Sequence, residues 1–420
     1  MDTLRRALRW LQPGLGVKRW IALLLLGLVA VGFGALLTFN LYAWDVVASL
    51  GSTAQASLIG IIAILAGLTI VALSLVAMVR NIARAILPDE KELVDRMWAQ
   101  RRLGSGIKVV ALGGGTGLSS LLRGLKAFSN NITAIVVVSD DGGSSGRLQR
   151  EVPSLSLPPG DIRNCLAALA DEEPLMTRLL QYRFNESAHE LEGHSIGNLL
   201  IAALEDITGD FEEAIRETSR VLAIRGKVLP PTLDSVQLCA RLKDGSTVLG
   251  ESAIGRCDSP IDYVYLDPAT PEPLPEALDA IAAADLIVIG PGSLYTSVIP
   301  NLLVPRIASA IAASPAIRAF VCNVMTQPGE TSHMTAAEHV QAVMRHTEQQ
   351  VFDYVILNNR RPQKDVLQRY DASGAEFISP DARQIAKLGF MPVEAPLLAA
   401  ENFARHDPHE LARLLVGLAE

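Results

Sequence analysis

Two long apolar runs without charged residues open the chain. The first extends from Trp20 to Phe39 and the second from Val46 to Val79, and neither contains Asp, Glu, Lys or Arg. About twenty helical residues rise roughly 30 Å, which is the thickness of a bilayer's hydrocarbon core. We therefore predict a two-helix transmembrane hairpin with spans at about residues 20–44 and 56–79, forming a membrane anchor over residues 1–80.

The charges that flank the two runs predict an orientation. The basic residues nearest the runs are Arg5, Arg6, Arg9, Lys18 and Arg19 before them, and Arg80, Arg84 and Lys91 after them. The loop between the runs carries only Asp45. By the positive-inside rule we expect a multi-pass protein of the cytoplasmic membrane, with its N-terminus and soluble domain in the cytoplasm. A cleaved signal peptide is the alternative, but its apolar region would be shorter and no second span would follow.

Beyond a charged juxtamembrane linker at residues 81–104, buried strands alternate with helical patterns over residues 105–420. The predicted strands are Ile107–Leu112, Ile132–Val138, Leu286–Ile289, Ala319–Val324 and Tyr354–Leu357. Residues 162–225 have helical periodicity, and residues 234–267 alternate as short antiparallel strands do. This order is typical of an α/β fold with a mostly parallel sheet and helices on both faces.

Charge and cysteine content narrow the classes of function. Residues 1–102 carry 11 Lys and Arg against 6 Asp and Glu, a net of +5, whereas the whole chain carries −8, so residues 103–420 carry −13. An acidic soluble part argues against a nucleic-acid partner. The four cysteines are scattered without a C-x-x-C pair, so neither disulfides nor a zinc site are expected.

Glycine-rich turns follow two of the predicted strands, where ligands of open parallel sheets bind. The first turn is Gly113, Gly114, Gly115, Thr116 and Gly117; the second contains Gly290, Gly292 and Ser293, with Asn301 beyond it. A glycine turn that opens a helix offers free N–H groups to a phosphate. The first turn is not a dinucleotide fingerprint, because Leu118 replaces the final glycine, and no P-loop lysine follows. Each turn could also be a plain strand–helix connection.

Asp140 and Asp141 follow the second predicted strand. One of them could accept a ribose hydroxyl, or the pair could hold Mg²⁺, which prefers oxygen ligands. The next residues that could bind a phosphate are Ser144, Ser145 and Arg147. A solvated turn is the alternative.

Three more polar clusters are candidates for the same site. They are Asp161, Arg163 and Asn164; His194, Ser195 and Asn198; and Asn323 and Thr326. Asp161 is expected to be a helix N-cap, with Arg163 and Asn164 in a first turn that could reach a ligand. His194 is either a general acid or base or a hydrogen-bonded structural histidine. Ser195 has no evident triad partners, so no catalytic residue is assigned.

The ordered motifs GGGTG, SDDGGSSGRL, LPPGDIRNCL, EGHSIGNLL, KVLPPT, IGPGSLYTSVIPNLL and VCNVMTQPGET resemble the YvcK-type gluconeogenesis-factor family of the CofD-like (2-phospho-L-lactate transferase) superfamily. The resemblance covers about residues 107–420 and implies a Rossmann-like three-layer α/β/α domain. It also implies that the two glycine turns flank phosphates, that Asp140 and Asp141 meet a metal or ribose, and that Asn198, Asn323 and Thr326 line the cleft. The N-terminal hairpin is expected to be a departure from the family's soluble form.

The resemblance implies a regulator that binds a UDP-sugar such as UDP-N-acetylglucosamine and links gluconeogenic carbon metabolism to cell shape and wall synthesis. The alternative is a Mg²⁺-dependent phospholactyl-type transferase with a nucleotide diphosphate donor, so whether the chain is an enzyme stays open. Mg²⁺ is a possible cofactor, and no tightly bound flavin or NAD is expected. The expected partners are a UDP-sugar or another nucleotide diphosphate, the bilayer, cell-wall synthesis or regulatory proteins, and a second copy of the chain.

Overall fold

The computed structural model describes residues 18–38, 53–86, 103–152, 155–171, 173–185, 191–257, 259–399 and 403–420. The chain divides into two compact units, residues 1–101 and residues 102–420, and each is described by itself. The predicted linker at residues 81–104 falls mostly outside the described residues, so the proposed domain boundaries stay predictions.

The described residues of the N-terminal unit form two helices, α2 (Lys18–Thr38) and α4 (Thr53–Ile86). Both are long and apolar enough to cross a membrane, over Arg19–Thr38 and Ser57–Asn81, with mean hydropathies of 2.5 and 2.7. Residues 39–44 of the first predicted span lie outside the described residues. The second helix continues past residue 79, where we predicted its span to end.

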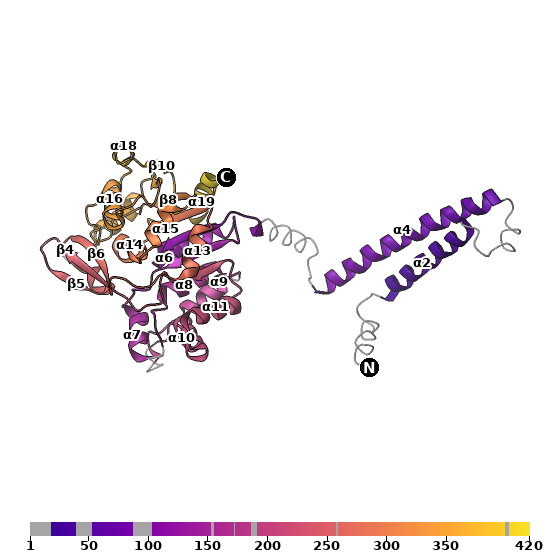
Figure 1. Cartoon of the computed structure of the whole chain (residues 1–420), viewed down its shortest axis with the longest axis horizontal. Helices are drawn as coiled ribbons and strands as arrows, with labels where there is room; N and C mark the ends of the chain where they lie inside the picture. The colour runs from indigo at the N-terminus through magenta and orange to yellow at the C-terminus, as the bar shows by residue number, and fades with distance from the viewer. Residues whose placement is uncertain are drawn as a thin grey trace. The chain divides into compact units, whose positions relative to one another are not determined.

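Glycines let the backbones of α2 and α4 touch. A Cβ atom added to Gly34 would lie 2.6 Å from the carbonyl oxygen of Gly60, and one added to Gly67 would lie 2.7 Å from that of Gly27. The contacts pair an early residue of α2 with a late one of α4, so the helices run antiparallel (Figure 1). Between apolar helices in lipid, such close packing through small residues is what holds the pair together.

A seven-stranded parallel sheet forms the centre of the second unit. Its strands are β1 (Val109–Gly113), β2 (Ile132–Val136), β3 (Lys227–Leu229), β7 (Leu286–Ile289), β8 (Ile317–Val321), β9 (Tyr354–Asn358) and β10 (Met391–Ala395). The strand order is β10-β9-β8-β7-β1-β2-β3. Gly113 pairs with Val136 and Leu112 with Ile289, so the carboxyl ends of β1, β2 and β7 are level at one edge. The predicted α/β fold is confirmed.

Alternate residues of each strand enter two separate cores, because successive side chains of a strand point to opposite faces. Val110 and Leu112 belong to the core under one face, and Val109 and Ala111 to the core under the other. The first core is covered by α13 (Pro275–Ala282), α14 (Ile299–Leu303), α15 (Ile307–Ala313) and α16 (Ala336–Thr347). The second is covered by α6 (Gly115–Leu125), α8 (Gly160–Leu169) and α19 (Pro408–Ala419), giving three layers (Figure 1).

The remaining elements surround this sandwich. They are α7 (Gly143–Glu151), α9 (Glu173–Gln181), α10 (Ile196–Thr208), α11 (Phe211–Val221), α12 (Glu251–Ile254), the π-helix η2 (Leu294–Val298), α17 (Lys364–Asp371) and α18 (Ala382–Lys387). An antiparallel sheet of β4 (Gln237–Leu242), β5 (Thr247–Leu249) and β6 (Ile261–Asp267) confirms the expectation for residues 234–267. The fourth predicted strand, Ala319–Val324, begins and ends a few residues after the observed strand β8, Ile317–Val321. The edge strands β3 and β10 were not predicted.

Candidate functional site

The two predicted glycine turns meet where the strand order reverses, between β1 and β7. A Cβ atom added to Gly117 would lie 2.5 Å from the carbonyl oxygen of Pro291, and one added to Gly292 would lie 3.4 Å from that of Gly114. Only glycine allows such an approach at Gly117. The turns therefore form one continuous wall at the switch point of the sheet, where ligands of this fold class bind.

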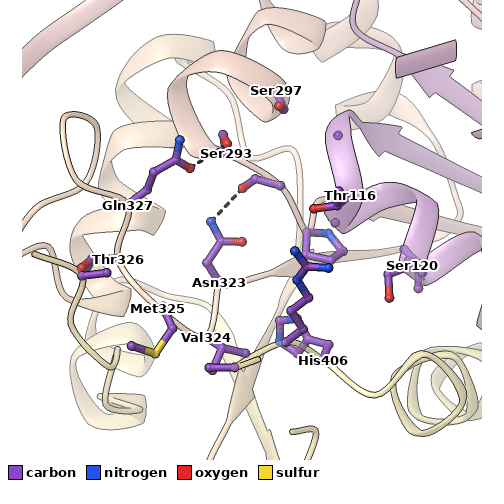
Figure 2. A pocket seen from close by; sticks show the side chains of 18 of the residues that line it. Thr116, Ser120, Ser293, Ser297, Asn323, Val324, Met325, Thr326, Gln327 and His406 are labelled. Carbon is purple, nitrogen blue, oxygen red and sulfur yellow. Dashed lines mark hydrogen bonds between the residues drawn. The ribbon is translucent and has the colours of Figure 1, made fainter. Parts of the chain in front are cut away.

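A cavity of about 340 Å³ lies against this wall (Figure 2). The predicted site residues that line it are Gly114, Gly115, Thr116, Gly117, Gly292, Ser293, Asn323 and Thr326. Asn323 Nδ2 donates to the carbonyl oxygen of Gly292 at 2.8 Å, and Ser293 Oγ donates to Gln327 Oε1 at 2.7 Å. Figure 2 shows both amide side chains pointing toward the Gly292–Ser293 turn, which they hold in place.

Tyr370, Arg405 and His406 are among the polar residues of this cavity that the sequence analysis did not name. Tyr370 belongs to α17, and the other two precede the Asp407 N-cap of α19. His406 is 8% exposed, and burial lowers its pKa to about 4, so its ring is neutral at pH 7. Its Nε2 atom has no hydrogen-bond partner among the described residues. The sequence signal was an Arg-His pair just before a helix, but no strand pattern pointed to it.

Asp161 is not the helix N-cap that we predicted. The N-cap position of α8 is Pro159, and Asp161 lies in the first turn of that helix. Its Oδ2 atom instead accepts the backbone N–H of Gly115, in the first glycine turn, at 2.6 Å. Burial raises the pKa of Asp161 to about 6, against the opposing effect of this hydrogen bond. A carboxylate thus stands directly behind the turn.

Asp140 and Asp141 lie beside the cavity without lining it. Asp140 accepts the N–H of Gly142 and Asp141 accepts the N–H of Ser252, each at 2.9 Å. Burial raises the pKa of Asp140. Burial, followed by the charges of Asp140 and Asp161, raises the pKa of Glu251 to about 9. The loop after β2, the start of α8 and α12 thus bring several acids into mutual repulsion.

This acidic group fits Mg²⁺ held together with a ligand. Among the described residues, no three His, Cys, Asp or Glu side chains form a group that could hold a metal by themselves. Mg²⁺ usually takes only one or two carboxylates and completes its shell with water and phosphate oxygens. Burial is the largest cause of the raised pKa values of Asp140, Asp161 and Glu251, and repulsion among these acids adds to it, an effect that a bound cation would relieve. Asp140 and Asp141 are the predicted ligands of the ion, and Asp161, whose charge interacts with that of Asp140, is a third carboxylate that would share it.

Another set of predicted residues forms a buried network behind the Asp140 loop. Arg163 donates to Ser195 Oγ at 2.6 Å, to Asn198 Oδ1 at 3.0 Å and to Asn164 Oδ1 at 2.9 Å. Asn198 also donates to Ser144 Oγ at 3.2 Å. These side chains support the loop, and none of them lines the cavity.

His194 is a buried, hydrogen-bonded histidine. Its Nδ1 atom lies 3.3 Å from Ser144 Oγ, and its Nε2 atom lies 2.8 Å from Arg147 and 3.0 Å from Glu151. Arg147 also donates to the carbonyl oxygen of Glu192. Ser145 packs against Gly160, where an added Cβ would lie 2.4 Å from its Oγ. The contacts of His194 are those of the structural alternative.

The last predicted residues hold the strand ends together. Asn301 is fully buried and its Nδ2 donates to the carbonyl oxygens of Gly113 and Ser297, at 3.1 and 2.7 Å. Gly113 and Gly290 end β1 and follow β7, and they do not line the cavity. These three residues shape the wall from behind.

Comparisons with known proteins agree with this architecture. The family model described as 2-phospho-L-lactate transferase CofD matches residues 109–398. A protein named gluconeogenesis factor from Bacillus subtilis (strain 168) is 48% identical over 317 residues, which cover 75% of this chain and 99% of the relative. A crystal structure of a Bacillus halodurans protein superposes with a TM-score of 0.72 at 46% identity, covering 74% of this chain and 100% of that one.

A relative from Nostoc sp. is 47% identical over 420 residues, which are 97% of this chain and 91% of the relative. A match of that extent includes the region of α2 and α4. The N-terminal region is therefore shared with some relatives and missing from others, and our expectation that it departs from the family is wrong for the Nostoc relative.

Proposed function

The chain belongs to the CofD family, and from that premise we propose that it is a membrane-tethered nucleotide-sugar-binding regulator related to gluconeogenesis. The observation that carries the proposal is the meeting of two glycine turns around one cavity at the β1/β7 switch point. The relative named gluconeogenesis factor supports the metabolic part. The links to UDP-N-acetylglucosamine, cell shape and wall synthesis come from the family resemblance.

The glycine wall suits a diphosphate. The N-terminus of α6 presents backbone N–H groups and the positive end of a helix dipole at Thr116 and Gly117. Asn323 fixes the opposing turn at Gly292. The carboxylate of Asp161 accepts the N–H of Gly115, so this N–H is not available to a ligand. The same carboxylate would repel an anionic ligand unless a cation lies between the ligand and Asp161. Mg²⁺ held by Asp140 and Asp141 and shared by Asp161 would supply that charge neutralisation.

The nucleoside would occupy the far end of the cavity. Tyr370 and Arg405 offer a ring face and a planar cation, both of which stack on bases. The neutral ring of His406 also lines the cavity, and its unpaired Nε2 atom is buried, so a base edge would pair with it after a small movement of the side chain. We propose that these three residues bind the base, which leaves the sugar on the side of the acidic group.

A transferase is the second candidate, and one observation favours it. The raised pKa of Glu251, about 9, keeps this acid protonated at pH 7 beside Asp140 and Asp161. Glu251 does not line the cavity, so it would donate its proton to a leaving oxygen through a water molecule or after a local movement. The family model described as 2-phospho-L-lactate transferase is compatible with this role.

Calorimetry on the full-length chain in detergent tests the proposal. UDP-N-acetylglucosamine, GDP and NAD are compared with and without Mg²⁺. Tight binding of the UDP-sugar without turnover supports the regulator. Binding of GDP together with phospholactyl transfer to a deazaflavin supports the transferase. If neither the UDP-sugar nor GDP binds, the proposed nucleotide site is refuted. The Arg405→Gln variant should lose affinity by about tenfold or more, whereas Arg413→Gln, an exposed arginine of α19, should bind as the wild type does.

A further inference from the structure

Glu330 lies between two cavities. One is the 340 Å³ cavity beside the glycine turns, called the nucleotide cavity below, and the other is a second cavity. It belongs to the loop that joins β8 to α16 and is 5% exposed. It lines a cavity of about 870 Å³ together with Tyr295 and Arg345. None of the residues that the structure describes lines both cavities. Gln327, three residues earlier on the same loop, lines the nucleotide cavity instead.

A chain of hydrogen bonds crosses the loop between the two cavities. Gln327 Nε2 donates to Glu330 Oε1 at 2.6 Å, and Thr296 Oγ1 donates to the same oxygen at 3.1 Å. Ser293 Oγ then donates to Gln327 Oε1 at 2.7 Å. Among the described residues, Glu330 Oε2 has no hydrogen-bond partner.

The negative charge of Glu330 determines which group donates and which accepts in each of these hydrogen bonds. An ionised carboxylate only accepts hydrogen bonds, so the amide nitrogen of Gln327 must face Glu330 and the amide oxygen must face Ser293. A serine hydroxyl has one hydrogen, and Ser293 donates it to the amide oxygen of Gln327. Toward the cavity it presents lone pairs, which suit a hydroxyl group or a cation but not a phosphate oxygen.

Loss of the charge removes this constraint. A neutral acid can donate as well as accept, so the amide of Gln327 is free to turn over. Its nitrogen then donates to Ser293, and the serine hydrogen becomes available to a phosphate oxygen of the ligand. The hydroxyl of Ser293 changes from an acceptor into a donor.

We propose that Glu330 is a positioning residue that sets, through Gln327, whether Ser293 offers the nucleotide a hydrogen-bond acceptor or a donor. This inference rests on the proposed function and adds to it a dependence of diphosphate binding on the proton state of a residue outside the nucleotide cavity. Glu330 acts on the ligand only through Gln327 and Ser293.

The surroundings of Glu330 are compatible with this role. Burial raises its pKa to about 7, against the opposing effect of the Thr296 hydroxyl and of the backbone N–H groups of Tyr295 and Thr296. The titratable groups that interact with it are Glu251 of α12 and Tyr295 of η2, and Arg345 interacts with Tyr295 in turn. The 870 Å³ cavity gives the loop a second exposure to solvent, through which a proton can exchange while the nucleotide is bound.

A double-mutant cycle tests the relay. Binding of UDP-N-acetylglucosamine, whose diphosphate diester does not titrate near neutrality, is measured by calorimetry at pH 8.5 in saturating Mg²⁺ on the full-length chain. Glu330→Gln should strengthen binding by about threefold to tenfold, as expected for one gained hydrogen bond. In the Ser293→Ala background the same change should alter the affinity by less than about twofold. Glu338→Gln is the matched control, because this exposed acid lines the same cavity without contacting Gln327.

Three outcomes overturn the relay. The first is that Glu330→Gln leaves the affinity unchanged, and the second is that Glu338→Gln changes the affinity as much as Glu330→Gln does. The third is that Glu330→Gln changes the affinity equally with and without Ser293, which would show a through-space charge effect. If the Glu330→Gln variant fails to fold, the pH dependence of nucleotide affinity tests the relay instead. The ratio of wild-type to Ser293→Ala affinity should rise by about threefold to tenfold between pH 8.5 and pH 6, and a constant ratio contradicts the relay. If wild type binds no UDP-sugar at any pH, the proposed function itself fails.

Discussion

Replacing Asp161 by asparagine should stabilise the unliganded protein and weaken its Mg²⁺-dependent nucleotide binding. The carboxylate is buried behind the first glycine turn, and its pKa is about 6 instead of 3.8. The folded state therefore holds the proton more tightly than the unfolded state does. Between about pH 4 and pH 6 the unfolded chain binds fewer protons, so stability falls as pH rises through this window and stays low above it.

The magnitude follows from the pKa difference. About 2 pKa units correspond to about 3 kcal/mol above pH 6. The pKa of about 6 already includes the opposing effect of the Gly115 hydrogen bond, and asparagine keeps an acceptor for that N–H. The net gain at pH 7.5 is then about 3 kcal/mol. For residues 102–420, an unfolding entropy of roughly 0.7 kcal/mol/K converts this gain into a Tm increase of roughly 4 °C.

Thermal unfolding followed by far-UV circular dichroism measures the gain, at pH 7.5 and pH 5. The advantage of Asp161→Asn should shrink to about half at pH 5, because wild-type Asp161 is then mostly protonated in the folded state. Asp206→Asn, an exposed acid in α10, is the matched control and should shift Tm by less than about 1 °C. An Asp161→Asn variant that is less stable than wild type at pH 7.5, or an equal gain in the control, refutes the reasoning.

Three further predictions concern the acidic loop and the hairpin. Asp140→Asn should weaken Mg²⁺-dependent nucleotide affinity by roughly 1–3 kcal/mol; unchanged affinity by calorimetry would mean that the acidic pair is only a turn. Gly60→Leu should lower the SDS fraction at which the hairpin unfolds, because its Cβ would lie 2.3 Å from Thr38 Oγ1, whereas Gly32→Leu, with no atom within 4 Å, should not. Since all four tryptophans precede residue 99, tryptophan fluorescence reports on this unit alone. Deleting residues 1–80 should release the protein from membranes with its ligand affinity intact, and a truncated chain that still sediments with membranes contradicts the anchor.

The sequence predicted the centre of the sheet well and its edges poorly. Leu286–Ile289 has the predicted bounds, because a fully buried strand is a continuous apolar run between turn residues. The edge strand β10 contains Pro392 and Glu394 and has no fully buried residue, so it lacks that pattern. β3 is only three residues long, and its lysine starts the strand.

The site was predictable where it follows a strand and not where tertiary contacts create it. Gly117 and Pro291 lie 174 positions apart, and the parallel register of β1 and β7 brings them together as expected. Asp161 has the local signature of an N-cap, yet its partner is a backbone N–H in a different helix. Arg405 and His406 carry no periodic signal, and they line the cavity through tertiary contacts such as the bridge between Leu398 and His406.

A structure of the full-length chain with UDP-N-acetylglucosamine and Mg²⁺ tests the central claim most directly. The account predicts that the diphosphate lies between the Gly114–Gly117 turn and the Gly292–Ser293 turn, with the base toward Arg405. A diphosphate bound elsewhere, with these two turns empty, would contradict it.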